Sequence, residues 1–120
     1  MQASWTITPE KIDAAIKRIV SVAQPRKVIL FGSVIAGKPD IHSDVDMLVV
    51  TGDEVESSRK ESVRIRRALR GIFMPMDILV IPETRLQEVA DQPGLVYREA
   101  IRHGRVVYDA VNDRQESLRG

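Results

Sequence analysis

The sequence contains no cysteine, few aromatic residues and almost no excess of one charge. Without cysteine there is no disulfide, no thiolate metal ligand and no thiol nucleophile, which is compatible with a reducing compartment. Aromatic residues make up 4% of the chain, too few to indicate a stacking platform for single-stranded nucleic acid. Lys and Arg number 18 and Asp and Glu number 17, so the net charge is +1. That balance gives no general attraction to nucleic acid or to an anionic membrane, and we expect neither as a partner.

Long apolar runs and internal repeats are also missing. No run approaches the roughly 18 apolar residues that a membrane span needs, and the first residues lack the apolar segment of a signal peptide. The chain has 120 residues, of which 43% are hydrophobic, and this suits one domain with a core. We expect a soluble, cytoplasmic protein with one domain over residues 1–109 and a polar tail over 110–120.

Helical and strand patterns follow one another along the chain. Thr8 and Pro9 suit the start of a helix, and apolar residues recur at helical spacing from Ile12 to Ala23. Short runs rich in Val, Ile and Leu indicate buried strands. The predicted helices cover 9–23, 54–70, a short stretch from the turn at Pro82 to about 89, and 95–103. The predicted strands cover 28–31, 44–50, 76–81 and 105–108, with a loop over 34–43. This order predicts an α/β (α+β) fold with a small mixed β-sheet covered by helices.

Three aspartates stand on two of the predicted strands. Asp44 and Asp46 are two residues apart, so their side chains share a face, and Asp77 lies near the start of the next strand. Taken singly, an aspartate such as Asp44 is ordinary turn chemistry. If the two strands pair, however, the three carboxylates converge, and two of them ~4 Å apart repel by about 4 kcal/mol at an effective dielectric near 20. The strands carry no Arg or Lys to neutralise them. A divalent cation relieves the repulsion, and oxygen ligands favour Mg²⁺ or Mn²⁺ over zinc.

A glycine-containing segment, GSVIAGK at residues 32–38, follows the first predicted strand. Gly32 and Ser33 allow backbone NH groups and a hydroxyl to approach a phosphate closely. The segment also matches the first seven positions of the P-loop, with Lys38 as its lysine. Pro39 replaces the Ser or Thr that binds Mg²⁺ in a P-loop and disfavours a helix there. A nucleotide hydrolase that uses Lys38 is therefore the weakest of the alternatives.

The order of these motifs resembles a known superfamily. Ten residues separate Ser33 from Asp44 in the run LFGSVIAGKPDIHSDVDMLVV, and MDILVI follows later with the third aspartate. This pattern is similar to that of the nucleotidyltransferase superfamily of DNA polymerase β. In particular, the chain resembles the minimal nucleotidyltransferases (the MNT or MntA-like group), which are single small domains and often antitoxin partners of HEPN proteins. The resemblance covers about residues 10–108, and REAIRHGRVVYD looks like that group's closing helix and strand.

The resemblance implies a polymerase-β-like palm over residues 1–109 and a specific chemistry. Asp44 and Asp46 would bind two Mg²⁺ ions, and Asp77 would complete one metal site and help to deprotonate an acceptor hydroxyl. Nucleotide binding is assigned to three residues: Gly32, Ser33 and Lys38. A nucleotidyl group, AMP if the NTP is ATP, would pass to a hydroxyl, and pyrophosphate would leave. The implied acceptor is a tyrosine of a HEPN-type helical partner, with this chain as the antitoxin of a toxin–antitoxin pair.

One position departs from the pattern of the small group. The segment there usually reads GS-x-A-R-G, whereas Ala36 stands at the arginine's place here and Lys38 is a cation at a different position. The lost cation motivates an alternative, in which a weak or inactive nucleotidyltransferase-fold antitoxin neutralises its partner by binding. The basic residues of the 54–70 segment are expected to form a solvated helix face, and His42 is expected to be solvated in its loop.

Overall fold

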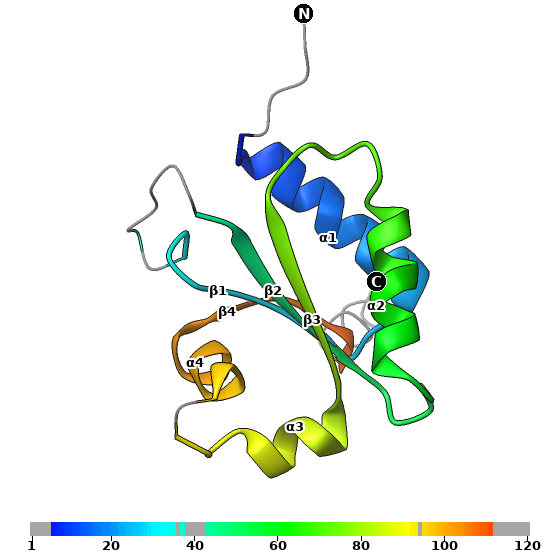
Figure 1. Ribbon diagram of the computed structural model, residues 1–120, viewed down its shortest axis with the longest axis vertical. Coiled ribbons are helices and arrows are strands. Elements are labelled where there is room, and N and C mark those ends of the chain that lie inside the picture. Colours follow the sequence, from blue (N-terminus) through cyan, green and yellow to red (C-terminus); the bar gives the residue numbers. More distant parts are fainter. Residues whose placement is uncertain (1–5, 36, 38–42, 94, 112–120) are drawn as a thin grey trace, which may run out of the picture.

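The computed structural model describes residues 6–35, 37, 43–93 and 95–111. Within these residues, four strands form one sheet in the order β3-β2-β1-β4, and four helices cover it (Figure 1). The strands are β1 (Lys27–Phe31), β2 (Val45–Thr51), β3 (Met76–Pro82) and β4 (Arg105–Asp109). The helices are α1 (Pro9–Ala23), α2 (Ser58–Ala68), α3 (Glu83–Val89) and α4 (Val96–His103). The predicted α+β fold with a small mixed sheet is confirmed.

The directions of the strands bring three chain segments to one end of the sheet. β1 pairs antiparallel with both β2 and β4, whereas β2 and β3 are parallel. The start of β2 and the start of β3 therefore lie next to each other, beside the end of β1. The turn after β1, which begins at Gly32, is thus close to the first residues of β2 and β3.

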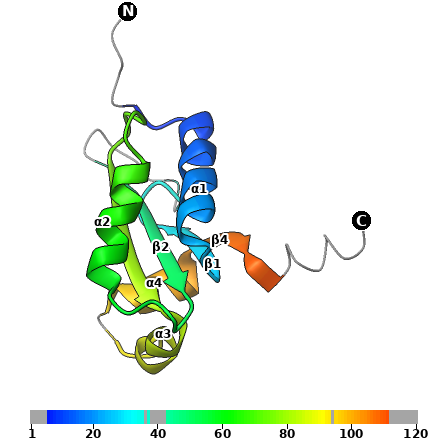
Figure 2. The same ribbon diagram turned by 90° about the vertical axis from the view of Figure 1, so that its right-hand side faces the viewer.

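Each face of the sheet has its own apolar layer, because side chains alternate along a strand. α1 and α2 pack side by side on one face, and α3 and α4 lie together on the other (Figures 1 and 2). The first layer includes Ile19, Met47 and Ile65, none of which is exposed. Truncation of such a residue to alanine typically costs 2–5 kcal/mol, so this layer anchors the sheet. The second layer contains the following buried residues: Ile29, Phe31, Leu48, Val50, Ile81, Leu86, Val89 and Ala100.

The ends of α1 follow the sequence signals. The backbone NH of Lys11 donates to Thr8 Oγ1 over 3.1 Å, and Pro9 occupies the first turn. The helix ends at Ala23, where Gln24 adopts a left-handed conformation with a φ of 45°. The predicted bounds 9–23 are confirmed.

The predicted helix 54–70 is too long at both ends. α2 begins at Ser58 because the Ser57 side chain caps it, accepting from the backbone NH of Lys60 over 3.2 Å. The acidic residues before that point lie outside the helix, and Glu61 is the acidic residue of the first turn. Gly71, at a φ of +93°, follows the other end. A serine cap that satisfies a backbone NH therefore decided the start, rather than the acidic residues.

Other boundaries differ by one residue. β2 begins at Val45, whose NH donates to the Pro75 carbonyl over 2.9 Å, so Asp44 precedes the strand instead of opening it. β1, β3 and β4 each include one residue more than predicted, and α4 begins at Val96 rather than at 95. The last nine positions of the predicted polar tail, 112–120, lie outside the described residues. No helix in the described part of the chain has the length and apolar character that crossing a membrane requires.

Candidate functional site

Two of the three predicted aspartates are direct neighbours across the sheet. Asp46 on β2 is in register with Asp77 on β3, and Phe31 at the end of β1 is in register with Asp46. In a parallel pair, residues in register point to the same face. Asp46 and Asp77 thus share the face covered by α3 and α4, at the end where β2 and β3 begin. Asp44 lies just before β2, two residues from Asp46.

The carboxylates act on one another electrostatically. The pKa of Asp46 is raised above its usual 3.8, first by partial burial, then by the negative charge of Asp77, and then by that of Asp44. Both kinds of cause disfavour the ionised form of Asp46. A cation placed beside these carboxylates would reverse the effect, because it neutralises the like charges.

Gly32 is in close contact with Asp46. It has a φ of +88°, in the left-handed region that favours glycine. A Cβ added there would lie 3.1 Å from Asp46 Cγ and would overlap Asp46 Oδ2. Only glycine therefore lets the turn after β1 approach this carboxylate. Ser33 follows, and its hydroxyl donates to Ser43 Oγ over 3.0 Å, which ties the turn to the residue just before Asp44.

Arg66 brings a cation to this end of the sheet, which the sequence analysis missed. Its Nη2 atom lies 3.9 Å from Asp77 Oδ1 and donates to the Ile78 carbonyl over 3.4 Å. The two strands that carry Asp46 and Asp77 contain no Arg or Lys, whereas Arg66 belongs to α2. Arg66 is exposed, as expected for a solvated helix face, but it also contacts Asp77. Its presence near Asp77 depends on how α2 packs against the edge of β3, a tertiary feature that spacing alone does not reveal.

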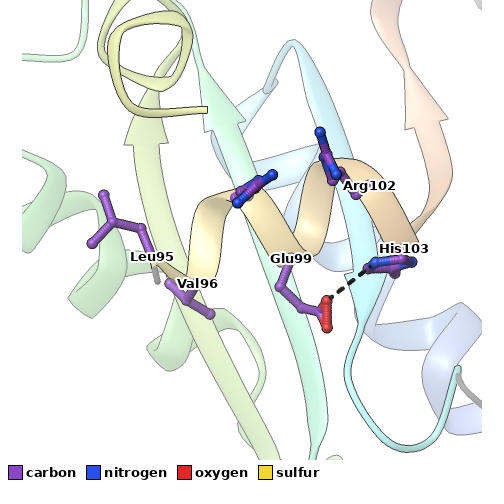
Figure 3. A pocket seen from close by; sticks show the side chains of 6 residues that line it. Leu95, Val96, Glu99, Arg102 and His103 are labelled. Atoms are coloured by element: carbon purple, nitrogen blue, oxygen red, sulfur yellow. Dashed lines mark ion pairs between the residues drawn. The ribbon is translucent and has the colours of Figure 1, made fainter. Parts of the chain in front are cut away.

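The surface beside the carboxylates is hollowed. Asp44 and Arg66 lie at a hollow of about 480 Å³, whose other lining residues are Leu69, Arg70, Gly71, Ile72, Phe73, Met74, Pro75, Met76 and Ile78. A separate hollow lies over α4, where Glu99 and His103 form an ion pair of 3.8 Å on one side of the helix (Figure 3). None of the three aspartates lines that second hollow. Of the three aspartates, only Asp44 lines the first hollow, which lies on the α1/α2 side of the sheet, whereas Asp46 and Asp77 are on the opposite face.

The comparisons with known proteins agree with this arrangement. A model of the family "Polymerase beta, Nucleotidyltransferase" matches residues 11–113. The chain belongs to the polymerase beta nucleotidyltransferase family. No curated protein matches the chain.

Two solved structures share the nucleotidyltransferase fold of this chain. One is a candidate nucleotidyltransferase from Sulfolobus solfataricus, with a TM-score of 0.57 and 17% identity over 83% of this chain and 78% of that one. The other is a toxin–antitoxin structure with AMP-PNP, with a TM-score of 0.52 and 16% identity over 91% of this chain and 79% of that one. At these identities the likeness concerns the fold alone.

The part of the nucleotidyltransferase loop that contains Lys38 is not described. Lys38, Ala36 and His42 all lie outside the described residues, so the prediction that Lys38 binds nucleotide stays a prediction. The described residues directly after β1, 32–35, form a bend and turns. The helix of a P-loop would begin near Lys38, outside the described residues, so these turns do not test it. The family match disfavours the P-loop alternative.

The donor set suits a metal that arrives with its substrate. In the residues that the structure describes, no group of three or more His, Asp or Glu side chains is arranged to hold a metal ion. Mg²⁺ in nucleotide-dependent enzymes is typically held by one or two carboxylates together with substrate phosphates and water. Asp46 and Asp77, in register on one face with Asp44 beside them, supply carboxylates of this kind. The residues present therefore fit a nucleotide-bound Mg²⁺ better than a cage made by protein alone.

Proposed function

We propose that this chain is a Mg²⁺-dependent nucleotidyltransferase that transfers AMP from ATP to a hydroxyl of a protein partner. The family assignment supports nucleotidyl transfer in general. The single observation that carries the proposal is the register of Asp46 with Asp77, beside the Gly32 turn. This places carboxylates next to backbone that can approach a phosphate closely.

Each residue has a defined role in the proposed reaction. Gly32 and Ser33 hold the triphosphate, together with Lys38. Asp44, Asp46 and Asp77 would hold two Mg²⁺ ions, or Mn²⁺ in their place, and the metal would neutralise phosphate charge and lower the pKa of the acceptor hydroxyl. The acceptor oxygen forms a bond to the α-phosphorus while the bond from that phosphorus to the bridging oxygen breaks. Pyrophosphate leaves with the bond's electron pair, and Asp77 helps to take up the acceptor's proton.

The second structural neighbour, a toxin–antitoxin structure with AMP-PNP, supports a protein partner. We propose that this chain acts as an antitoxin and that its partner is the HEPN-type helical toxin that the sequence resemblance implies. The acceptor hydroxyl would be a tyrosine of that toxin.

The test follows the α-phosphate. With Mg²⁺ and the co-expressed partner, the wild-type chain is expected to transfer label from α-labelled ATP, but not from γ-labelled ATP, to the partner. Asp46→Asn should reduce the transfer below detection. Asp53→Asn is the matched control: Asp53 lies just beyond the end of β2 that is farther from Asp46, where the backbone NH of Thr84 donates a hydrogen bond to it. Transfer that persists in Asp46→Asn, or label that comes from the γ-phosphate, would contradict the proposal.

A second candidate function is neutralisation by binding, without effective catalysis. The observation that favours it is the contact of Arg66 with Asp77, which occupies one of the carboxylates, together with the absence of a three-carboxylate metal group among the described residues. Cell survival separates the two functions. If a chain with both Asp44→Asn and Asp46→Asn still protects cells from the co-expressed toxin, binding suffices. Loss of protection with an intact complex favours catalysis.

A further inference from the structure

The guanidinium of Arg66 is held at three points at the edge of the sheet. Its Nε donates to Ser62 Oγ over 3.5 Å, and its Nη2 donates to the Ile78 carbonyl over 3.4 Å. The same Nη2 lies 3.9 Å from Asp77 Oδ1. β3 is the outermost strand on this side, so the arginine reaches from α2 on one face of the sheet to a carboxylate on the other. This arrangement places a positive charge beside Asp77.

A metal ion and this guanidinium need the same carboxylate. Asp77 lies in register with Asp46, and a divalent cation held by both would come within a few ångströms of Arg66. The two cations repel each other, and Asp77 cannot be fully engaged by both. The contact is also easily displaced, because about half of each side chain is exposed (51% for Arg66 and 57% for Asp77). Exposed ion pairs of this kind are weak.

We propose that Arg66 is a positioning residue that competes with the metal for Asp77. Without nucleotide, the guanidinium neutralises Asp77 and weakens metal binding. When nucleotide arrives, its phosphates supply metal ligands and a new anionic partner for Arg66, so Asp77 becomes free to bind the metal. Arg66 would thereby make metal binding depend on nucleotide. This inference rests on the proposed function and deepens it.

The size of the effect follows from Coulomb's law. A unit charge about 6 Å from a dication changes the dication's affinity about tenfold in a medium as polar as water. Salt reduces this further, since the Debye length falls from about 30 Å at 0.01 M to about 10 Å at 0.1 M. We therefore expect an effect of about 3- to 10-fold at low salt, which shrinks as salt is added.

The test measures Mn²⁺ binding directly, with and without a non-hydrolysable ATP analogue, by the electron paramagnetic resonance signal of free Mn²⁺. Arg66→Gln is expected to bind Mn²⁺ about 3- to 10-fold more tightly than wild type without nucleotide. The gain in Mn²⁺ affinity on adding nucleotide should be smaller by a similar factor, because in wild type part of that gain comes from nucleotide drawing Arg66 away from Asp77. Arg66→Lys keeps the charge and should stay close to wild type.

Arg67→Gln is the matched control. It removes the same charge from the same helix, but Arg67 lines a different hollow, with Arg59, Lys60, Val63 and Arg64. If Arg66→Gln and Arg67→Gln change Mn²⁺ affinity equally, the effect comes from the lost net charge and not from the contact of Arg66 with Asp77, and the inference is wrong. Weaker Mn²⁺ binding in Arg66→Gln would contradict it as well.

Asp46→Asn separates this inference from the proposed function. Mn²⁺ binding that is lost in Asp46→Asn but unaffected by Arg66→Gln overturns the inference and leaves the proposed site intact. No Mn²⁺ binding by the wild-type chain, even with nucleotide, contradicts both. Circular dichroism of each variant verifies folding, and Arg66→Met, which removes the charge but keeps the aliphatic stem, replaces Arg66→Gln if that variant does not fold.

Discussion

Substitution of Gly32 by alanine tests the geometry of the site most sharply. Gly32 combines a φ of +88° with a position where a Cβ would overlap Asp46 Oδ2. Two separate penalties follow: backbone strain, and displacement of the Asp46 side chain. Gly71→Ala isolates the first, because Gly71 has a φ of +93° and nothing lies within 4 Å of an added Cβ.

The expected magnitudes can be worked from these two features. A left-handed conformation costs a non-glycine residue about 1–2 kcal/mol, and the stiffer unfolded chain of an alanine variant offsets about 0.4–1 kcal/mol of this. Gly71→Ala should therefore lower the free energy of unfolding by about 1 kcal/mol. Pushing Asp46 off its rotamer adds about 0.5–1.5 kcal/mol, so Gly32→Ala should cost about 2 kcal/mol. The difference in cost between the two variants, about 1 kcal/mol, amounts to about 4 °C in Tm for a domain of this size.

The assay is a double-mutant cycle, measured by urea unfolding. In an Asp46→Ala background the overlapping oxygen is absent, so the cost of Gly32→Ala should fall to that of Gly71→Ala. The expected coupling between the two positions is about 1 kcal/mol, typical of residues in contact. Mg²⁺-dependent ATP binding should be lost in Gly32→Ala and kept in Gly71→Ala. Equal costs for the two glycine variants, with no coupling to Asp46, would refute the close approach of the turn to the carboxylate.

Three further predictions concern charge and capping. The pKa of Asp46 is raised in the folded chain, so the ionised carboxylate destabilises the fold. Asp46→Asn should therefore raise the free energy of unfolding by about 0.5 kcal/mol at neutral pH. When urea unfolding is repeated at lower pH, the stability difference between variant and wild type should shrink as pH falls through the raised pKa, and vanish below 3.8, where Asp46 is protonated in both the folded and the unfolded chain. Thr8→Ala removes the α1 cap and should lower the free energy of unfolding by about 1 kcal/mol in the same assay, and an unchanged midpoint would contradict the capping role. Hydrogen bonds from the Thr84 hydroxyl and backbone NH lower the pKa of Asp53. Thr84→Val removes the hydroxyl, so an NMR titration should find the pKa of Asp53 raised toward 3.8. An unchanged pKa would show that the hydroxyl does not lower it.

The fold was largely predictable from the sequence because its signals are local. Short apolar runs rich in Val, Ile and Leu identified the strands of the described sheet, and Thr8 with Pro9 identified the start of α1. The start of α2 was misplaced because a single serine, Ser57, caps the helix after a stretch of acidic residues. Local patterns that compete over a few residues are where boundaries go wrong.

The part of the site that could be predicted from the sequence is the pair of aspartates on the adjacent strands β2 and β3. The fixed side-chain period of a strand predicted a shared face for Asp44 and Asp46, and Asp77 was expected beside them only if the two strands pair. They do pair, with Asp46 and Asp77 in register. Arg66 could not be anticipated in this way, since its contact with Asp77 depends on the packing of α2 at the edge of β3. The overlap between a Cβ at Gly32 and the Asp46 carboxylate likewise depends on tertiary distance, although a glycine directly after a strand was a signal for close approach.

We propose that the carboxylates at the start of β2 and β3 carry a site for metal-bound nucleotide. The decisive measurement is calorimetry of ATP binding, with and without Mg²⁺, on three chains: the wild type, Asp44→Asn/Asp46→Asn, and Lys38→Ala. We expect Mg²⁺-dependent binding that disappears in the double aspartate variant and persists, though weaker, in the lysine variant. Binding that survives the loss of both aspartates, or that depends on Lys38 alone, would contradict it.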